Sequence, residues 1–125
     1  MLMKKVLPYL FAVILLASAG GHLLTPEIYA PLIPDFVPEL AANVLAAISE
    51  AAVAILLLVP KWRHWGGLSF ALLMLAFLPI HVWDLVRDDP FFTPLAAAVI
   101  RVVVQFLLIY AGWRIYKRAQ AQVVA

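Results

Sequence analysis

The sequence predicts an all-α fold: a single domain over residues 1–125 that forms a transmembrane four-helix bundle running up and down. Of the 125 residues, 66% are hydrophobic and 13% are charged, whereas an ordinary soluble domain has about 25% charged residues. This composition excludes a soluble enzyme, a disordered tail and a nucleic-acid-binding domain. The chain also has no cysteine, which excludes disulfides, thiol redox chemistry and covalently attached haem.

Four apolar segments predict helices at about residues 4–23, 38–60, 64–87 and 93–117. Lys, Arg, Asp and Glu are absent from residues 6–26 and 64–83, and segments 40–60 and 90–113 each contain one of them. Each segment therefore reaches the length of about 20 residues that a helix needs to cross a bilayer. Residues 1–19 also resemble a signal peptide, but we expect a retained helix because the other three spans need no cleaved leader.

The connections between the predicted helices are rich in proline and in charge. The first contains Pro26, Pro31, Pro34 and Pro38, the second is Pro60–Arg63, and the third is Asp88–Pro90. Small residues such as Gly67 and Gly112 would let neighbouring helices approach closely.

The basic residues, all but Arg87 and Arg101, lie at one end of the predicted bundle. They are Lys4, Lys5, Lys61, Arg63, Arg114, Lys117 and Arg118. The positive-inside rule therefore predicts that both termini are cytoplasmic. We also expect that the protein lies in the cytoplasmic (inner) membrane and that these basic residues contact membrane lipid.

Two charged residues fall inside the spans, where a charge is costly and usually faces the bundle interior. Glu50 lies about 18 Å along its helix from Pro38, and Asn43 lies on the same helical face. Arg101 lies on the last predicted helix, with Gln105 one turn further on. Because a guanidinium suits a carboxylate, we expect Glu50 and Arg101 to form a buried ion pair.

Further polar residues lie at the outer ends of the helices. His81 and Asp84 share one face of the third helix after Pro79, whose ring frees a carbonyl and favours a kink. His22 ends the first helix on the same side. The predicted polar cluster is His22, Asn43, Glu50, His81, Asp84, Arg101 and Gln105.

Four interpretations of this cluster remain open. It is a ligand pocket that opens outward, a structural polar network, a metal or haem site built on His22 and His81, or a proton or ion pathway. The metal or haem interpretation is less favoured than the pocket and the structural network, because two histidines and an acid often coincide without ligating a metal.

The first connection, from Leu24 to Val37, is apolar as well as proline-rich, and Glu27 and Asp35 are its only charges. A disordered linker would be polar. We expect a lid over the outer mouth of the bundle; the alternative is a segment that lies on lipid head groups. The lid residues singled out are Pro26, Tyr29 and Pro34.

Five blocks in order carry a family resemblance. They are His22–Tyr29 with Pro34, Ala46–Glu50, Pro60–Arg63 with Trp65–Gly66, Leu78–His81, and Arg101–Gln105. Together they resemble the DoxX-like family of small four-helix membrane proteins. The chain departs from the family pattern at His81, where members usually have Asn, and at Ala46–Ala47, where they usually have Ser-Gly.

The resemblance implies an accessory or binding subunit of membrane redox chemistry, because relatives include a small subunit associated with a thiosulfate:quinone oxidoreductase. The partner would then be a membrane oxidoreductase or another protein, and the ligand a quinone-like or lipidic molecule near Glu50, His81 and Arg101. The alternative is a structural or assembly-factor protein with a ligand-free polar core, as in other relatives. The sequence shows no nucleophile–base arrangement, phosphate loop or strong metal spacing, so we do not expect a free-standing enzyme.

Overall fold

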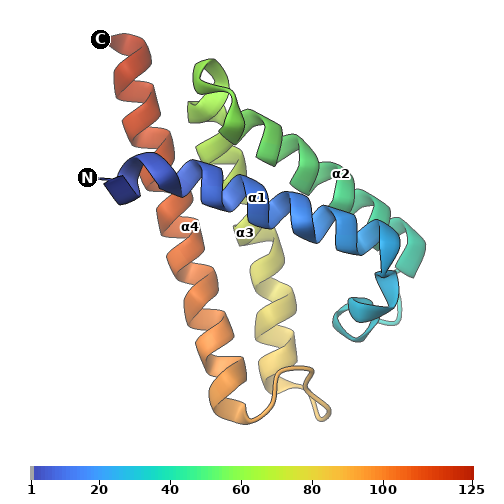
Figure 1. The fold of residues 1–125 in the computed structure, drawn as a ribbon. Coiled ribbons are helices and arrows are strands. Elements are labelled where there is room, and N and C mark those ends of the chain that lie inside the picture. The colour runs from blue at the N-terminus through green and yellow to red at the C-terminus, as the bar shows by residue number, and fades with distance from the viewer. Residues whose placement is uncertain (1) are drawn as a thin grey trace.

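The computed structural model describes residues 2–125, and within them the fold is all-α, with four long helices that run up and down (Figure 1). The helices are α1 (Leu2–Leu24), α2 (Glu39–Leu58), α3 (Arg63–Val86) and α4 (Leu95–Val124). Three short 3-10 helices lie in the connections: η1 (Pro26–Ile28), η2 (Ala30–Leu32) and η3 (Pro60–Trp62). The four long helices are each long and apolar enough to cross a membrane, as expected of an integral membrane protein.

The helix bounds agree with the sequence prediction to within two residues, except at the end of α4. That helix continues to Val124, beyond the predicted end at residue 117. The prediction stopped where hydropathy falls, but residues 119–122 are alanine and glutamine, which are good helix formers. At 1.5 Å per residue α4 is about 45 Å long, so it exceeds the roughly 30 Å apolar core of a bilayer.

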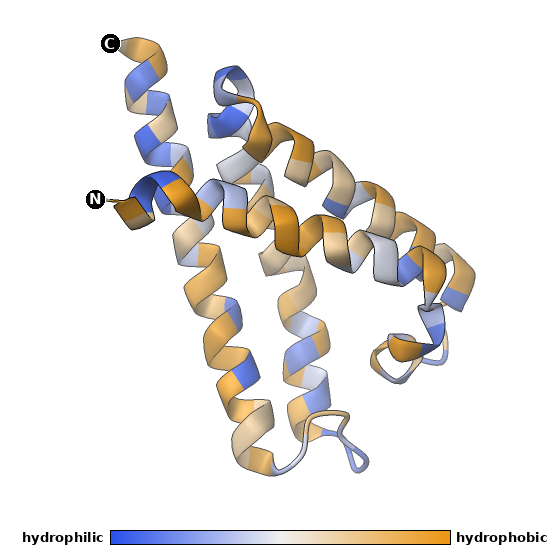
Figure 2. Ribbon diagram, viewed as in Figure 1, coloured by the Kyte–Doolittle hydropathy of each residue, from blue (hydrophilic) through white to orange (hydrophobic). Residues whose placement is uncertain are grey.

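The residues of the four long helices are largely hydrophobic (Figure 2). Large exposed hydrophobic residues occur on all four long helices, among them Val13, Leu45, Leu72 and Leu107. Such surfaces suit contact with lipid chains, because lipid imposes no cost on exposed apolar side chains.

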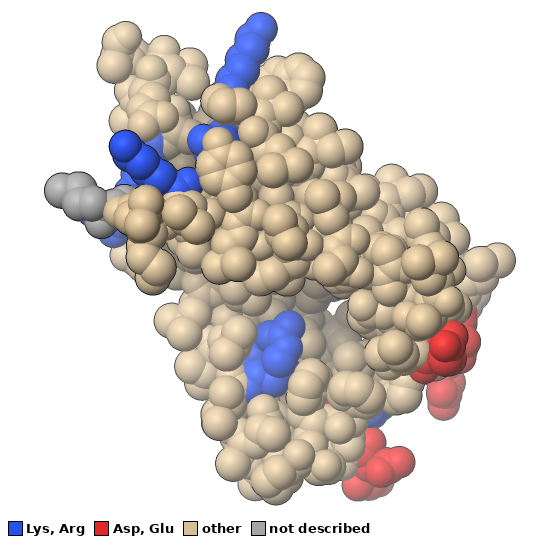
Figure 3. All heavy atoms as spheres, in the orientation of Figure 1, with Lys and Arg blue, Asp and Glu red and all other residues tan. Residues whose placement is uncertain are grey.

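Charges separate to the two ends of the molecule, which we call the basic end and the acidic end. The basic end carries both chain termini and η3, together with Lys4, Lys5, Lys61, Arg63, Arg114, Lys117 and Arg118. The acidic end carries the α1–α2 and α3–α4 connections, with Glu27, Asp35, Glu39, Asp88 and Asp89. Figure 3 shows the two groups at opposite ends of one face, with a further basic patch in the middle of that face.

The bundle consists of two helical hairpins. Helices α1 and α2 run side by side, as do α3 and α4 (Figure 1). The hairpins meet toward the basic end and diverge toward the acidic end. The connections near the acidic end therefore lie where the hairpins are furthest apart.

The apolar core lies where the hairpins meet and draws on all four long helices. The ring of Phe11 on α1 stacks on that of Phe70 on α3, with centroids 4.6 Å apart and planes 7° from parallel. Around them the buried residues Val53 on α2 and Ile115 on α4 complete the contact between the hairpins. This core fixes the two hairpins relative to each other.

A glycine contact holds α3 and α4 together in this half. A Cβ on Gly67 would lie 2.9 Å from the carbonyl oxygen of Gly112 and would also collide with the backbone nitrogen of Tyr116. Backbone atoms cannot move aside as a flexible side chain can, so only glycine fits here. The close approach of small residues is a common way for helices to pack in lipid.

Candidate ligand-binding cavity

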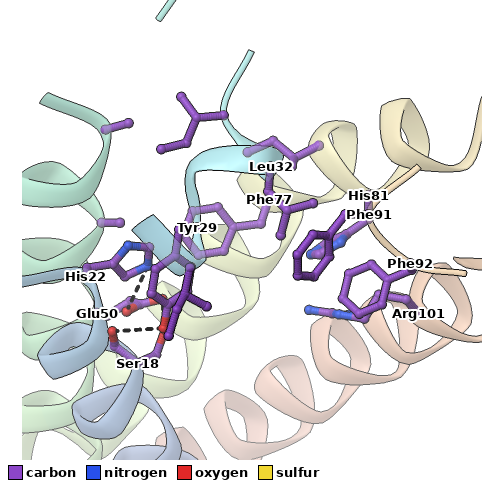
Figure 4. A pocket seen from close by; sticks show the side chains of 15 residues that line it. Ser18, His22, Tyr29, Leu32, Glu50, Phe77, His81, Phe91, Phe92 and Arg101 are labelled. Carbon is purple, nitrogen blue, oxygen red and sulfur yellow. Dashed lines mark hydrogen bonds and ion pairs between the residues drawn. The ribbon is translucent and has the colours of Figure 1, made fainter. Parts of the chain in front are cut away.

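A cavity of about 340 Å³ lies between the two hairpins, on the side of the acidic end (Figure 4). Every long helix contributes to its wall, together with the α1–α2 and α3–α4 connections. The lining residues are Ser18, His22, Ile28, Tyr29, Leu32, Ile33, Ala42, Ala46, Glu50, Phe77, Ile80, His81, Phe91, Phe92 and Arg101. Most of these side chains are apolar, and five of them are ionisable: His22, Tyr29, Glu50, His81 and Arg101.

Glu50 is the central polar group of the wall formed by α1 and α2. Its side chain is buried, with 4% of the residue exposed. Atom Oε1 accepts a hydrogen bond from the hydroxyl of Ser18 at 3.1 Å. Atom Oε2 lies 3.8 Å from Nε2 of His22 and has no hydrogen-bond partner among the described residues.

Asn43 determines how His22 faces Glu50. The amide nitrogen of Asn43 donates to the carbonyl of Glu39 at 3.0 Å, which turns the amide oxygen toward Nδ1 of His22 at 2.7 Å. Because an amide oxygen only accepts, Nδ1 must carry a hydrogen. In neutral His22, Nε2 is then an acceptor, so attraction between Nε2 and the Glu50 carboxyl group requires a further proton on one of them.

Tyr29 closes this side of the cavity from the α1–α2 connection. Its ring stacks on His22, with centroids 3.7 Å apart, and its hydroxyl donates to the carbonyl of Ser18 at 3.4 Å. A Cβ on Gly21 would lie 2.7 Å from the Tyr29 hydroxyl, so the glycine makes room for the ring. Residues of η1 and η2 thus lie against α1 and over the cavity.

The other two residues singled out for the lid do not line this cavity. Pro26 is the first residue of η1, where its fixed φ suits a helix start. Pro34 lies beside a second pocket, on the outer side of α3, which Pro79 and Trp83 also line. Helix α3 continues through Pro79 to Val86.

Arg101 is the main polar group of the wall formed by α3 and α4. Its Nη1 donates to Oε1 of Gln105 at 2.9 Å. The amide nitrogen of Gln105 in turn donates to the backbone carbonyl of Met74 on α3. Gln105 is fully buried and does not line the cavity, so its role is to position the guanidinium.

The ion pair expected between Glu50 and Arg101 is not formed. Within residues 2–125 the carboxyl groups that lie at ion-pair distance from a basic side chain are Glu50, beside His22, and Asp84, beside Arg87. Glu50 and Arg101 both line the cavity, but they do so from different hairpins (Figure 4). Sequence position measures depth along each helix, and it carries no information on the lateral distance that the diverging hairpins create.

His81 and Asp84, which were predicted to share one face of the third helix, make separate contacts. His81 is buried in the cavity wall, its Nδ1 has no hydrogen-bond partner among the described residues, and its ring lies 6.2 Å from that of Phe92. Asp84 is 1% exposed and is absent from the lining. Its two oxygens accept from the backbone nitrogens of Phe91 at 2.7 Å and Phe92 at 3.0 Å, which holds both rings at the cavity.

Arg87 joins the two connections at the acidic end, a role that the sequence prediction missed. Its Nη2 lies 2.9 Å from Oδ1 of Asp84, and its Nη1 donates to the carbonyl of Pro31 at 2.7 Å. The guanidinium also lies over the ring of Trp83, 4.4 Å from the centroid. The spacing of three residues between Asp84 and Arg87 was the available signal for this pair, since such residues share a helix face.

The two histidines proposed for metal or haem lie on opposite walls of the cavity, His22 on α1 and His81 on α3 (Figure 4). Residues 2–125 contain no group of three or more His, Cys, Asp or Glu side chains that could hold a metal ion. The cavity wall carries one carboxyl group, two imidazoles and one guanidinium, from Glu50, His22, His81 and Arg101.

The fold and the cavity define a class: an all-helical protein whose four long helices are long and apolar enough to span a membrane, with a mostly apolar cavity that contains a few ionisable groups between two hairpins. Residues 11–116 match the family described as Domain of unknown function (DUF8561), so the chain belongs to that family. No curated protein and no solved structure matches the chain. The resemblance to the DoxX-like family stays a prediction from the motifs.

Proposed function

We propose that this is an integral membrane protein that binds an amphipathic molecule, quinone-like or lipidic, in the cavity between its hairpins. The supporting observation is the composition of the cavity wall, which is mostly apolar but includes His22, Glu50, His81 and Arg101. Small-molecule sites typically have volumes of about 300–1,000 Å³ and combine apolar walls with a few placed polar groups. The cavity of about 340 Å³ fits that description.

The proposal places the protein in the cytoplasmic membrane with the basic end and both termini in the cytoplasm, as the positive-inside rule favours. The cavity then lies in the outer half of the bilayer. Its biological setting is membrane redox chemistry, in which the protein serves as an accessory or binding subunit of a membrane oxidoreductase. Kinship with DoxX-like proteins is part of this proposal.

The second candidate is a structural or assembly-factor protein with no small-molecule ligand. It is favoured by the hydrogen bonds that the polar residues make among themselves. The bonds between helices are Ser18 to Glu50, His22 to Asn43, and Gln105 to the Met74 carbonyl. Such bonds would pin helix to helix even in an unoccupied bundle.

Gentle purification followed by native mass spectrometry and an absorption spectrum tests the two candidates. Ligand binding predicts a stoichiometric extra mass on the 13.8 kDa chain, with a quinone absorption band if the ligand is a quinone. Arg101→Ala and Glu50→Gln should each lose that mass while much of the fold survives, because both residues line the cavity.

Matched controls come from the same helices. Arg114→Ala on α4 and Glu39→Gln on α2 alter exposed side chains that do not line the cavity, so the extra mass should persist. If the wild type carries no extra mass, and Arg101→Ala and Glu50→Gln simply unfold in detergent, the structural role is the better account.

A further inference from the structure

We infer that the ligand is an acidic amphiphile, whose carboxylate or phosphate group binds Arg101 and whose apolar body fills the rest of the cavity. This inference rests on the proposed function and specifies the class of ligand. The observation behind it is that the two walls of the cavity differ in their charged groups.

Arg101 has no partner of opposite charge within the described chain. The carboxyl groups of Glu50 and Asp84 lie at ion-pair distance from His22 and Arg87, not from Arg101, and the hydrogen bond from the Arg101 guanidinium goes to the neutral amide of Gln105. A guanidinium stays charged under all ordinary conditions. A half-buried cation in a membrane-spanning helix is costly unless an anion or water accompanies it. The wall that carries Arg101 therefore favours the binding of an anionic ligand.

The guanidinium is also held in place before any ligand arrives. The chain of hydrogen bonds from Arg101 to Gln105 and on to the Met74 carbonyl fixes its orientation. One of its five N–H donors is used in that chain, and the others can serve a ligand. Two N–H groups side by side match the oxygens of a carboxylate or phosphate, which is the geometry that makes such contacts strong.

His81 adds a second polar group beside Arg101. Figure 4 shows both side chains on the same side of the cavity, with Phe91 and Phe92 next to them. The imidazole is buried and its Nδ1 has no partner in the described residues, so a ring N–H can donate to an acidic group. The two phenylalanine rings cover this region and reduce its contact with water, which strengthens the electrostatic attraction.

The wall formed by α1 and α2 does not favour a cationic ligand bound at Glu50. Glu50 already receives the Ser18 hydroxyl and lies near His22, so it has local partners where Arg101 has none of opposite charge. Between the walls, Tyr29, Leu32 and Phe77 offer apolar surface to the body of the ligand (Figure 4).

The test uses the full-length protein in phosphatidylcholine nanodiscs and four probes with similar tails: dodecanoate, dodecanol, dodecyltrimethylammonium and decylbenzoquinone. Native mass spectrometry of a titration gives the affinity of each probe. Dodecanoate should bind wild-type protein about tenfold or more tightly than dodecanol, since a charge-assisted pair supplies at least that factor. Dodecyltrimethylammonium should bind more weakly than dodecanol.

Variants locate the effect. Arg101→Gln should remove the preference for dodecanoate over dodecanol, whereas Arg114→Ala on the same helix should keep it. Because Arg101→Gln keeps a polar side chain but shortens it and removes the charge, its melting temperature serves as the check on folding. If it does not fold, Arg101→Lys, which retains the charge and loses the paired donors, should reduce the preference without removing it.

Two further titrations distinguish a single-chain acid from an anionic phospholipid as the ligand. Dodecyl phosphate titrated into the same nanodiscs reports a single-chain phosphate, and nanodiscs of phosphatidylglycerol report an anionic phospholipid, which would compete with dodecanoate. Binding of dodecanol or decylbenzoquinone as tightly as dodecanoate overturns the acidic inference and leaves the proposed function standing. Failure of all the probes to bind overturns the proposed function as well.

Discussion

The half of the molecule toward the basic end and the half toward the acidic end are held together by different means. Toward the basic end the two hairpins touch through the stacked rings of Phe11 and Phe70, and within the second hairpin α3 and α4 approach closely at Gly67 and Gly112. Toward the acidic end the hairpins diverge, and hydrogen bonds and ion pairs join the surfaces around a cavity. The comparison indicates that close packing supplies most of the stability and that the polar half can change with less effect on the fold.

This division follows from the physics of lipid. Lipid chains are as apolar as leucine, so burying apolar surface between helices gains little, and tight packing of small residues drives association instead. Polar contacts between membrane helices contribute about 0.6 kcal/mol on average. A region that depends on such contacts is easier to open than one in which backbone approaches backbone.

The largest effect is expected from Gly67→Val in the closely packed half. The added side chain would press on backbone atoms of Gly112 and Tyr116, and overpacking of this kind costs about 3 kcal/mol or more because backbone cannot shift locally. The melting temperature in nanodiscs should fall sharply. Gly20→Ala is the control, because a Cβ there meets no neighbouring atom of the described chain within 4 Å; equal losses in both variants would contradict the comparison.

A smaller effect is expected from Asp84→Asn in the polar half. The substitution keeps the shape but weakens the acceptor for Phe91 and Phe92 and the pair with Arg87. We expect a loss of about 2 kcal/mol, typical of a disturbed buried acceptor. Hydrogen exchange of the amides at residues 91 and 92 should accelerate while the amides of the Phe11–Phe70 region stay protected.

The control for Asp84→Asn is Asp88→Asn, a change in the neighbouring connection that makes no ion pair within residues 2–125. It should leave exchange at residues 91 and 92 unchanged. If Asp84→Asn instead exposed both halves equally, the two halves would unfold as one unit and the proposed division would be wrong.

The smallest effect is expected from Ser18→Ala. It removes the hydroxyl that donates to Glu50 and keeps the apolar packing of α1. A loss of about 0.6 kcal/mol is expected, the average for a hydrogen bond between membrane helices. Unfolding titrations with a denaturing detergent would measure it, and a loss as large as that of Gly67→Val would show that the polar contacts dominate stability.

The helices were predictable because their positions depend only on the order of apolar, charged and proline residues along the chain. Long charge-free segments between prolines set the ends of α1, α2 and α3, and a residue count fixes the level of Glu50 or Arg101 along its helix. The end of α4 was missed because hydropathy falls before helix propensity does, at residues 119–122. Hydropathy reports contact with lipid, and the helix continues after that contact ends.

The contacts within the site were less predictable, because they depend on distances between helices. Glu50 and Arg101 lie on the same cavity, but the divergence of the hairpins separates them, and no count along the sequence contains that angle. Helical spacing placed Asp84 on the same face as His81, whereas its carboxylate accepts hydrogen bonds from backbone amides of the α3–α4 connection. The path of that connection also brings Phe91 and Phe92 to the cavity, and it has no periodic pattern to read.

The three-residue turn η3 is the covalent link between the two hairpins, and this has a practical consequence. Both ends of each hairpin lie at the basic end, so each hairpin is a complete pair of potential membrane spans. We therefore expect that the chain can be divided at Lys61 into two genes whose products associate through the Phe11–Phe70 core. Reassembly of such halves would turn ligand binding between them into a split-reporter signal.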